Sequence, residues 1–360
     1  MIAINATVWD SRPSGLGVIA RELTARIAGI RKDTAVFCSG SLCPDAAIHK
    51  VSPWVCGRHG PVSGGTLRFL WTQTVLPFRL KALGAKVLLS PNHEAMLFPP
   101  CAQAVAVHDL LPLLYPESYP RQRLYYRRVF PMILRKAEAI VALSENTKKD
   151  LVRHYGLPPS KITVVYPGVD HGLFRPVPGA SASEPYILFV GNQYPYKNIR
   201  GLLEAFSGLV REGCSHRLFL AGGKQPPHAV DALGLGDRVR SLDYVARDDL
   251  PRLYSQADLL VLPSLYEGFG LPALEAMACG CPVAVSRTSS LPEVCGEAAC
   301  YFDPVDPSDI KRAISEVLSD RTRRERMIAS GLAQAAKFRW EDTAKAYVGL
   351  LTRLERDAAP

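Results

Sequence analysis

The stretch SLYEGFGLPALEAMACG, residues 264–280, places a glycine-rich loop directly before a short predicted helix. Pro272 suits the first position of a helix, where a missing backbone N–H leaves no hydrogen bond unmade. Gly270 precedes it and leaves the backbone N–H groups of the turn open to a ligand. Residues 269–273 are therefore expected to present the positive end of a helix to an anion.

Two carboxylates of the same stretch stand eight positions apart: Glu267 in the loop and Glu275 in the first turn of the predicted helix, which Gly280 is expected to end. Carboxylate oxygens accept hydrogen bonds from sugar hydroxyls, so two of them can hold two sugar rings on either side of a phosphate. The alternative is that Glu275 complements the helix dipole while Glu267 is a surface acid. Spacing alone favours neither interpretation.

Around this stretch, short β-rich runs alternate with helical periodicity, as a parallel sheet covered by helices requires. Strands are predicted within residues 2–5, 27–40, 86–91, 104–109, 139–144 and 162–170, and then within 186–192, 217–223, 239–245, 259–264 and 282–286. The apolar face of a helix from about Val18 is predicted to be Ile19, Leu23, Ile27 and Ile30. A helix over residues 197–213 is predicted to bury Leu202, Leu203, Phe206 and Val210.

The stretch RPVPGASASEP, residues 175–185, has no periodicity and suits a linker. It divides the chain into one αβ domain over residues 1–174 and a second over 186–340. Residues 341–360 are expected to form a helix that packs back on the first domain. Ligands of such sheets bind at the carboxyl ends of strands, so the loops there are the places to search for a site.

Composition limits the possible partners and the location. The formal net charge of +9 favours anions such as phosphates, acidic lipids or nucleic acid. The sequence has neither a leader pattern at its start nor a run of ~20 apolar residues, so we expect a cytoplasmic protein. Its nine cysteines are scattered without a CxxC pair and are expected to be reduced and buried. A metal site is disfavoured at the four cysteines with the closest spacing, which are Cys279, Cys281, Cys295 and Cys300.

Two further loops after predicted strands carry candidate anion contacts. In SGLG, residues 14–17, Gly15 and Gly17 let backbone N–H groups approach an anion, although a plain tight turn fits equally well. In VGNQYPYKN, residues 190–198, Lys197 stands beside a helix start and can reach a phosphate, although most lysines are simply solvated. A dinucleotide site is disfavoured, because no acid ends the second strand to hold a ribose.

These residues resemble a family. EGFGLPALE followed by AMACGCPV is similar to the E-x7-E signature of the retaining glycosyltransferases of family 4, and ITVVYPGVD, FVGN…KN, LFLAGG, ADLLVLPSLYEGFG, SSLPEVCGEAACYFDP and RWEDTAKAY occur in family order. The resemblance covers nearly the whole chain and is more specific in the second half. It implies an α/β protein of the GT-B fold, with two facing Rossmann-like domains and a cleft between them. The first would bind the acceptor and the second the nucleotide sugar.

Carried over by position, the resemblance implies that Glu275 holds the ribose hydroxyls of a sugar nucleotide and that Glu267 contacts the donor sugar or balances charge at the reacting carbon. Lys197 would be the cation on the phosphates, and the backbone of Phe269, Gly270 and Leu271 would face the donor. Glu267, Lys197 and His108 would be the catalytic side chains.

In the first domain, Gly15 and Gly17 match the family's glycine loop beside the phosphate and acceptor, and His108 matches a histidine near the transferred sugar. Many members carry an Arg where this chain has Asn192, so neutralisation of the phosphates would rest more on Lys197. The base and sugar are expected to contact side chains near Tyr244, Val245 and the 108–112 loop.

Two basic and aromatic segments of the first half, residues 67–84 and 121–139, suit an anionic membrane surface. Ordinary core-facing helices with solvated arginines are the alternative for each. Nucleic acid is disfavoured, because no recognisable binding motif organises the charge.

INATVWDSRPSGLGVIAREL, residues 4–23, and VHDLLPLLYPESYP, residues 107–120, look most like bacterial mannosyltransferases that build surface polysaccharide. The resemblance therefore implies a retaining hexosyltransferase that uses GDP-mannose and a lipid-linked or polysaccharide acceptor, cytoplasmic or peripheral on the inner face of the membrane. A UDP-glucose-dependent enzyme and a non-catalytic sugar-nucleotide binder are the alternatives. An oxidoreductase or epimerase would need a ribose-binding acid and a Tyr/Lys pair, which we do not find. No cofactor is expected: no DxD motif stands out, and the resemblance implies an enzyme that works without a metal.

Overall fold

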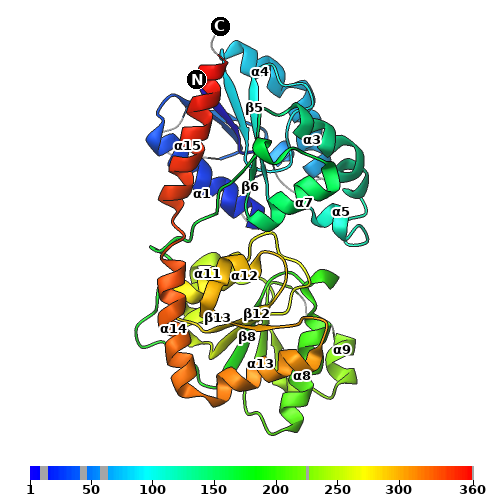
Figure 1. The fold of residues 1–360 in the computed structure, drawn as a ribbon, viewed down its shortest axis with the longest axis vertical. Helices are drawn as coiled ribbons and strands as arrows, with labels where there is room; N and C mark the ends of the chain where they lie inside the picture. The colour runs from blue at the N-terminus through cyan, green and yellow to red at the C-terminus, as the bar shows by residue number, and fades with distance from the viewer. Residues whose placement is uncertain (9–14, 41–46, 57–63, 224–226, 359–360) are drawn as a thin grey trace. The chain divides into compact units, whose positions relative to one another are not determined.

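The computed structural model describes residues 1–8, 15–40, 47–56, 64–223 and 227–358. The chain forms two compact units, unit 1 from Met1–Gly168 with Trp340–Pro360 and unit 2 from Val169–Arg339 (Figure 1). The predicted boundary at residue 174 is therefore wrong by six residues. Val169 and Phe174, which are 4% and 1% exposed, pack in the core of unit 2 because the chain enters that core before it reaches the irregular stretch 175–185.

Unit 1 is built on a seven-stranded parallel sheet with the order β3-β2-β1-β4-β5-β6-β7. Its strands are β1 (Ile2–Asn5), β2 (Thr34–Cys38), β3 (Ala47–Lys50), β4 (Val87–Ser90), β5 (Ala102–Val107), β6 (Ala139–Ala142) and β7 (Ile162–Val164). Its α-helices are α1 (Gly15–Ile30), α2 (Pro53–Cys56), α3 (Gly64–Thr74), α4 (Leu76–Ala82), α5 (Leu111–Leu114), α6 (Phe130–Lys136), α7 (Glu145–Tyr155) and α15 (Trp340–Asp357). Helices α1 and α15, from opposite ends of the chain, lie side by side (Figure 1).

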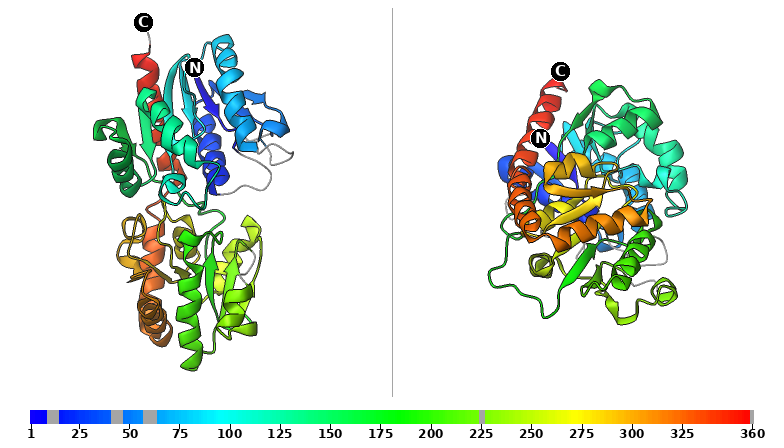
Figure 2. Two further views of the ribbon diagram at one scale, coloured as in Figure 1. Left: turned by 90° about the vertical axis from the view of Figure 1, so that its right-hand side faces the viewer. Right: turned by 60° about the horizontal axis from the view of Figure 1, so that its bottom comes forward.

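Unit 2 is built on a six-stranded parallel sheet with the order β10-β9-β8-β11-β12-β13. Its strands are β8 (Tyr186–Val190), β9 (Arg217–Ala221), β10 (Val239–Ser241), β11 (Leu259–Leu262), β12 (Val283–Ser286) and β13 (Ala299–Phe302). Its α-helices are α8 (Ile199–Arg211), α9 (Pro227–Ala232), α10 (Leu250–Gln256), α11 (Leu271–Ala278), α12 (Leu291–Cys295), α13 (Pro307–Ser319) and α14 (Arg321–Ala335). Helices cover both faces of each sheet (Figure 2).

The central strands are buried on both faces, as parallel sheets require. Every residue of β1, β4, β11 and β12 is buried. The continuous apolar runs that this burial needs are what made these strands recognisable in the sequence. Two edge strands, β3 and β13, were not predicted, because no residue of β3 is fully buried and β13 buries only alternate residues, so neither is a continuous buried apolar run.

The sequence predicted two apolar helix faces that extend one turn beyond the buried part of each helix. Helix α1 buries Ile19, Leu23 and Ile27 as predicted, but Ile30 is 48% exposed. In α8, Val210 is only partly buried. Both residues stand in the last turn of their helices, beyond the part that packs on the sheet, so the periodicity continues where the core does not.

Candidate functional site

The loop between β11 and α11 carries the two glutamates of the opening stretch. Gly270 has φ +102°, and a Cβ atom there would lie 2.8 Å from Leu291 Cδ2, so this turn requires glycine. The turn lets the helix begin at Leu271, one residue before Pro272. Glu275 is therefore the fifth residue of α11 and lies in its second turn, so the prediction of the first turn is wrong.

Lys197 and Glu267, predicted from separate motifs, form an ion pair. Lys197 Nζ donates to Glu267 Oε1 over 2.6 Å, and Ser264 Oγ donates to the same oxygen over 2.7 Å. Lys197 and Glu267 are 9% and 8% exposed, and Ser264 is fully buried. The carboxyl end of β11 thus meets the loop after β8, its neighbour in the sheet.

The chain holds Glu267 in place through its backbone. Its N–H donates to Ser289 Oγ over 2.9 Å, and its carbonyl accepts from Ser290 Oγ over 2.9 Å. Because a lysine ammonium has three protons and the carboxylate takes one, Lys197 retains donors for a second anion. A nearly buried pair with this geometry is suited to receive a diphosphate, since the added negative charge meets a fixed cation.

A close approach of two glycines shapes the end of β8. A Cβ atom on Gly222, which has φ +109°, would lie 2.5 Å from the carbonyl oxygen of Gly191. Asn192 follows and is exposed, and its Nδ2 donates to the Tyr196 hydroxyl over 3.5 Å. This amide carries no charge, so within this loop the cation near the site is Lys197.

Glu275 lies beside a buried phenol. Tyr254, which is fully buried, donates its hydroxyl hydrogen to Glu275 Oε2 over 3.0 Å. Burial raises the pKa of the Glu275 carboxyl to about 7, against the opposing effects of the Tyr254 hydrogen bond and the positive charge of Arg247. The carboxyl therefore changes its charge near neutral pH, and shifted carboxyl pKa values of this kind cluster at functional sites.

The other residues of unit 2 that were predicted to contact the donor differ in their exposure to solvent. Phe269 is 5% exposed and packs edge-on against Phe338, with ring centroids 5.9 Å apart, so its side chain belongs to the core. Leu271 is partly buried against the same core. Tyr244 is 63% exposed, whereas Val245 next to it is partly buried against the core.

In unit 1, His108 follows β5 at the carboxyl edge of the sheet. It is 9% exposed, and its Nε2 lies 2.8 Å from the carbonyl oxygen of Pro91. A carbonyl only accepts, so Nε2 carries the proton and Nδ1 is the acceptor of the neutral ring. Burial lowers the pKa of His108 to about 4, with a smaller contribution from His93. The side chain is thus a neutral acceptor near pH 7.

His93 is a further candidate site residue, and the motifs in the sequence did not indicate it. Its ring packs against Tyr125, Tyr126 and Phe130, with centroids 6.1, 5.4 and 6.3 Å away, and burial lowers its pKa. It follows β4, which neighbours β5, so the topology brings it to the same edge as His108. The signal was present in the sequence, as a histidine three residues after the end of a buried strand.

Of the predicted glycine loop, the structure describes only the part from Gly15 onward. Gly15 is exposed and is the first residue of α1, and Gly17 is buried in the same helix. Ser14 and the preceding residues of the loop lie outside the described residues.

The basic and aromatic segments divide into a buried and an exposed face. Between residues 121 and 139, Tyr126 and Phe130 are in the core, while all six basic side chains of the segment are exposed together with Leu124 and Met132. Phe69 of α3 contacts Tyr125 at 5.7 Å between ring centroids, so the two segments adjoin. Among the described residues, no helix is long and apolar enough to cross a membrane.

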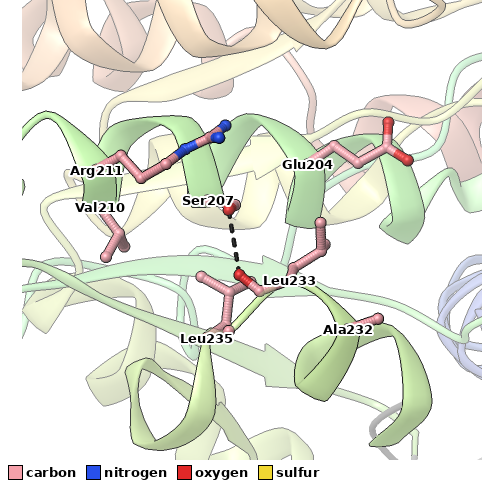
Figure 3. Close-up of a pocket in the computed structure, with 8 residues that line it drawn as sticks. Glu204, Ser207, Val210, Arg211, Ala232, Leu233 and Leu235 are labelled. Atoms are coloured by element: carbon pink, nitrogen blue, oxygen red, sulfur yellow. Dashed lines mark hydrogen bonds between the residues drawn. The ribbon is translucent and has the colours of Figure 1, made fainter.

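A separate hollow of about 340 Å³ lies between α8 and the end of α9 (Figure 3). Its wall includes Ser207, whose hydroxyl donates to the Leu233 carbonyl over 3.3 Å. No predicted site residue lines it. Within the described ranges, no group of three or more His, Cys, Asp or Glu side chains is placed to hold a metal ion.

Two family models match adjacent parts of the chain. Glycosyltransferase Family 4 matches residues 13–173, and Glycosyl transferases group 1 matches residues 172–334. The chain belongs to the family 4 glycosyltransferases. The family that the glutamate motif indicated is thereby confirmed.

Relatives of this family 4 glycosyltransferase include two proteins of Escherichia coli. It is 36% identical over 251 residues to O-antigen chain mannosyltransferase B, covering 65% of this chain and 66% of that protein. It is 32% identical over 268 residues to the serotype-specific mannosyltransferase WbdA, covering 69% of this chain and 33% of that protein. The chain thus spans just under two thirds of the first relative and about a third of the second.

The fold of this family 4 glycosyltransferase is similar to that of sucrose-phosphate synthase from Thermosynechococcus elongatus. The TM-score is 0.81 at 22% identity, and the match covers 99% of both chains. The predicted fold class, GT-B with two Rossmann-like domains, is confirmed.

Proposed function

We propose that this glycosyltransferase moves mannose from GDP-mannose to a hydroxyl of a lipid-linked or polysaccharide acceptor, with retention of the anomeric configuration. The acceptor hydroxyl and GDP-mannose give the mannoside, GDP and a proton. The names of both relatives support mannose as the sugar, since each is called a mannosyltransferase. The observation that carries the proposal is the buried contact between Lys197 and Glu267 at the carboxyl edge of the unit 2 sheet.

In this proposal unit 2 binds the donor. Glu275 accepts hydrogen bonds from the ribose hydroxyls, which favours its ionised form. Lys197 donates to the diphosphate, and the backbone N–H groups at the start of α11 face the same charge. Glu267 holds Lys197 in position and contacts the hexose. Asn192 adds no charge to the phosphates, so Lys197 carries most of their neutralisation.

During transfer, the bond between the hexose C1 and the diphosphate oxygen breaks, and negative charge grows on the leaving diphosphate. A fixed cation and oriented N–H groups stabilise such charge without reorganisation. We therefore propose that no metal ion is needed. Turnover measured before and after EDTA treatment tests this proposal. Activity should be unchanged. A loss of activity that only a divalent ion restores would overturn the proposal.

The donor is tested by melting the purified protein with a panel of nucleoside diphosphates and sugar nucleotides. A ligand at 100 times its dissociation constant adds about 2.7 kcal/mol of stability. GDP and GDP-mannose should raise Tm, and the Glu275→Gln variant should lose the shift. If UDP raises Tm and GDP does not, GDP-mannose is rejected as the donor and UDP-glucose is favoured. Slow hydrolysis of GDP-mannose separates an enzyme from a non-catalytic binder.

The stereochemical proposal has its own measurement. The anomeric configuration of the product is read by NMR after incubation with GDP-mannose and a polysaccharide acceptor. An α-mannoside is expected from the α-linked donor, and a β-mannoside would exclude retention.

A further inference from the structure

A second cluster of reactive groups lies at the opposite edge of the unit 2 sheet. Cys214 and His216 stand in the connection between α8 and β9, and Asp258 directly precedes β11. Since β9 and β11 both flank β8 in a parallel sheet, their amino ends meet at one edge. Lys197 and Glu267 follow the carboxyl ends of β8 and β11, so the cluster is separate from the proposed donor site.

The three side chains form a continuous chain of polar contacts. Cys214 Sγ lies 3.6 Å from His216 Nδ1, and His216 Nε2 lies 3.4 Å from Asp258 Oδ2. Arg238 donates to the backbone carbonyls of both Cys214 and His216 and so fixes the turn that brings them together. An imidazole held between a thiol and a carboxylate takes the thiol proton and keeps it, because the carboxylate stabilises the imidazolium.

Charge and exposure both suit a reactive thiol. The contact with His216 lowers the pKa of the Cys214 thiol against the effect of burial, and Arg238 adds a smaller lowering. Asp258 and then Cys214 raise the pKa of His216 to about 9. Cys214 is partly exposed, between the exposed residues Gly213 and Ser215. Burial instead raises the thiol pKa of the other seven cysteines in the described ranges, which are Cys38, Cys56, Cys101, Cys279, Cys281, Cys295 and Cys300.

We propose that Cys214, activated by His216 and Asp258, is a reversible modification site that forms mixed disulfides with small disulfides. The Cys214 thiolate attacks one sulfur of the disulfide RS–SR, a new S–S bond forms, the old one breaks, and RS⁻ leaves. The product is Cys214–S–SR, and a free thiol reverses the step by the same exchange. No oxidant other than the disulfide is consumed.

The test uses the full-length folded protein in a Cys43→Ser background, because Cys43 lies outside the described residues. The probe is an aromatic disulfide, 5,5′-dithiobis(2-nitrobenzoate), and adducts are assigned by peptide mass spectrometry. Cys101, which is also partly exposed but has a raised thiol pKa, is the reference inside the same molecule. At pH 6, Cys214 should be modified at least tenfold faster than Cys101, and Cys214→Ser should abolish the fast phase.

The dependence on His216 distinguishes activation from simple exposure. In His216→Gln the rate at pH 6 should fall about tenfold and rise with pH as for an ordinary thiol. If this variant unfolds locally, the buried Cys281 of the same unit also becomes reactive, and Asp258→Asn then supplies the comparison with an expected partial loss at pH 6. A Cys214 rate at pH 6 that equals that of Cys101, or that neither substitution lowers, would overturn the proposal.

Discussion

At the scale of single residues, the carboxyl of Glu275 predicts a pH dependence of stability. Burial raises its pKa to about 7, above the value of ~4.3 that an unfolded chain gives. The folded state therefore keeps a proton that the unfolded state releases. The resulting stabilisation is fully present below about pH 4.3 and is lost as the pH rises to about 7. Urea denaturation of the wild type should show this fall, and Glu275→Gln should lack it; parallel curves would contradict the assignment.

The same carboxyl should make nucleotide affinity depend on pH, and this dependence should have the opposite sign to that of stability. Ribose hydroxyls donate to the ionised form, so GDP affinity should rise with pH up to about 7 and then level off. Calorimetry at several pH values measures the affinity for GDP. The phosphate of GDP also titrates, but it affects the wild type and Glu275→Gln equally, so the difference between the two proteins reports on Glu275. Glu275→Ala should cost roughly 1.5–3 kcal/mol of binding above pH 7, the range for a charge-assisted hydrogen bond.

The pair of Lys197 and Glu267 predicts non-additive effects. Lys197→Met leaves the buried Glu267 carboxylate without its cation, and loss of one partner of such a pair costs about 3–5 kcal/mol. The double variant Lys197→Met/Glu267→Gln should be more stable than Lys197→Met alone, because no charge remains unpaired. Chemical denaturation of the four proteins measures the coupling. Additivity within about 0.5 kcal/mol would show that the two side chains do not interact.

At the scale of elements, the ends of β8 and β9 depend on the contact between Gly191 and Gly222. A Cβ atom on Gly222 would overlap the Gly191 carbonyl, and φ +109° disfavours any other residue. Gly222→Ala should therefore destabilise unit 2 by about 3 kcal/mol or more and weaken nucleotide binding. Gly234→Ala is the matched control, since Gly234 has φ +63° and open space, and should cost only about 1–2 kcal/mol. Equal melting temperatures for the two variants would refute this.

The elements also show why the sequence predicted some features and not others. Buried central strands were recognisable because both faces must be apolar, whereas edge strand β3 has no such requirement. Helix periodicity could not indicate that Ile30 lies beyond the core. Lys197 and Glu267 were each predicted, but their ion pair depends on the adjacency of β8 and β11, which lie about 70 residues apart in the chain and are paired only by the sheet topology.

At the scale of the whole molecule, unit 1 is closed by the two ends of the chain. The terminal ammonium of Met1 pairs with Glu355 of α15, and Arg31 donates to the same carboxylate over 2.9 Å. Trp340 and Tyr347 of α15 are nearly fully buried. The sequence predicted that a helix in this region packs on the first domain, but no local pattern indicates that its partners are α1, β4 and β5.

The exposed surface of unit 1 predicts binding to anionic membranes, where a lipid-linked acceptor would lie. Exposed apolar side chains such as Phe78, Phe98 and Leu124 accompany the exposed arginines of residues 121–139, and the Lys136 ammonium lies 3.6 Å from the Phe98 ring centroid. Each basic residue near such a surface contributes about 1 kcal/mol, and salt screens it. The protein should therefore sediment with vesicles that contain phosphatidylserine at low salt, and less so as salt is added.

Two variants with the same change in net charge test whether the surface of unit 1 is responsible. Arg127→Gln/Arg128→Gln should weaken vesicle binding about thirtyfold, which is the loss of about 2 kcal/mol expected for two charges near the surface. Arg200→Gln/Arg321→Gln removes two exposed charges from unit 2, where the side chains are 86% and 85% exposed, and should change binding far less. Equal losses in the two variants would mean that only net charge matters, and no sedimentation of the wild type at low salt would exclude a peripheral membrane location.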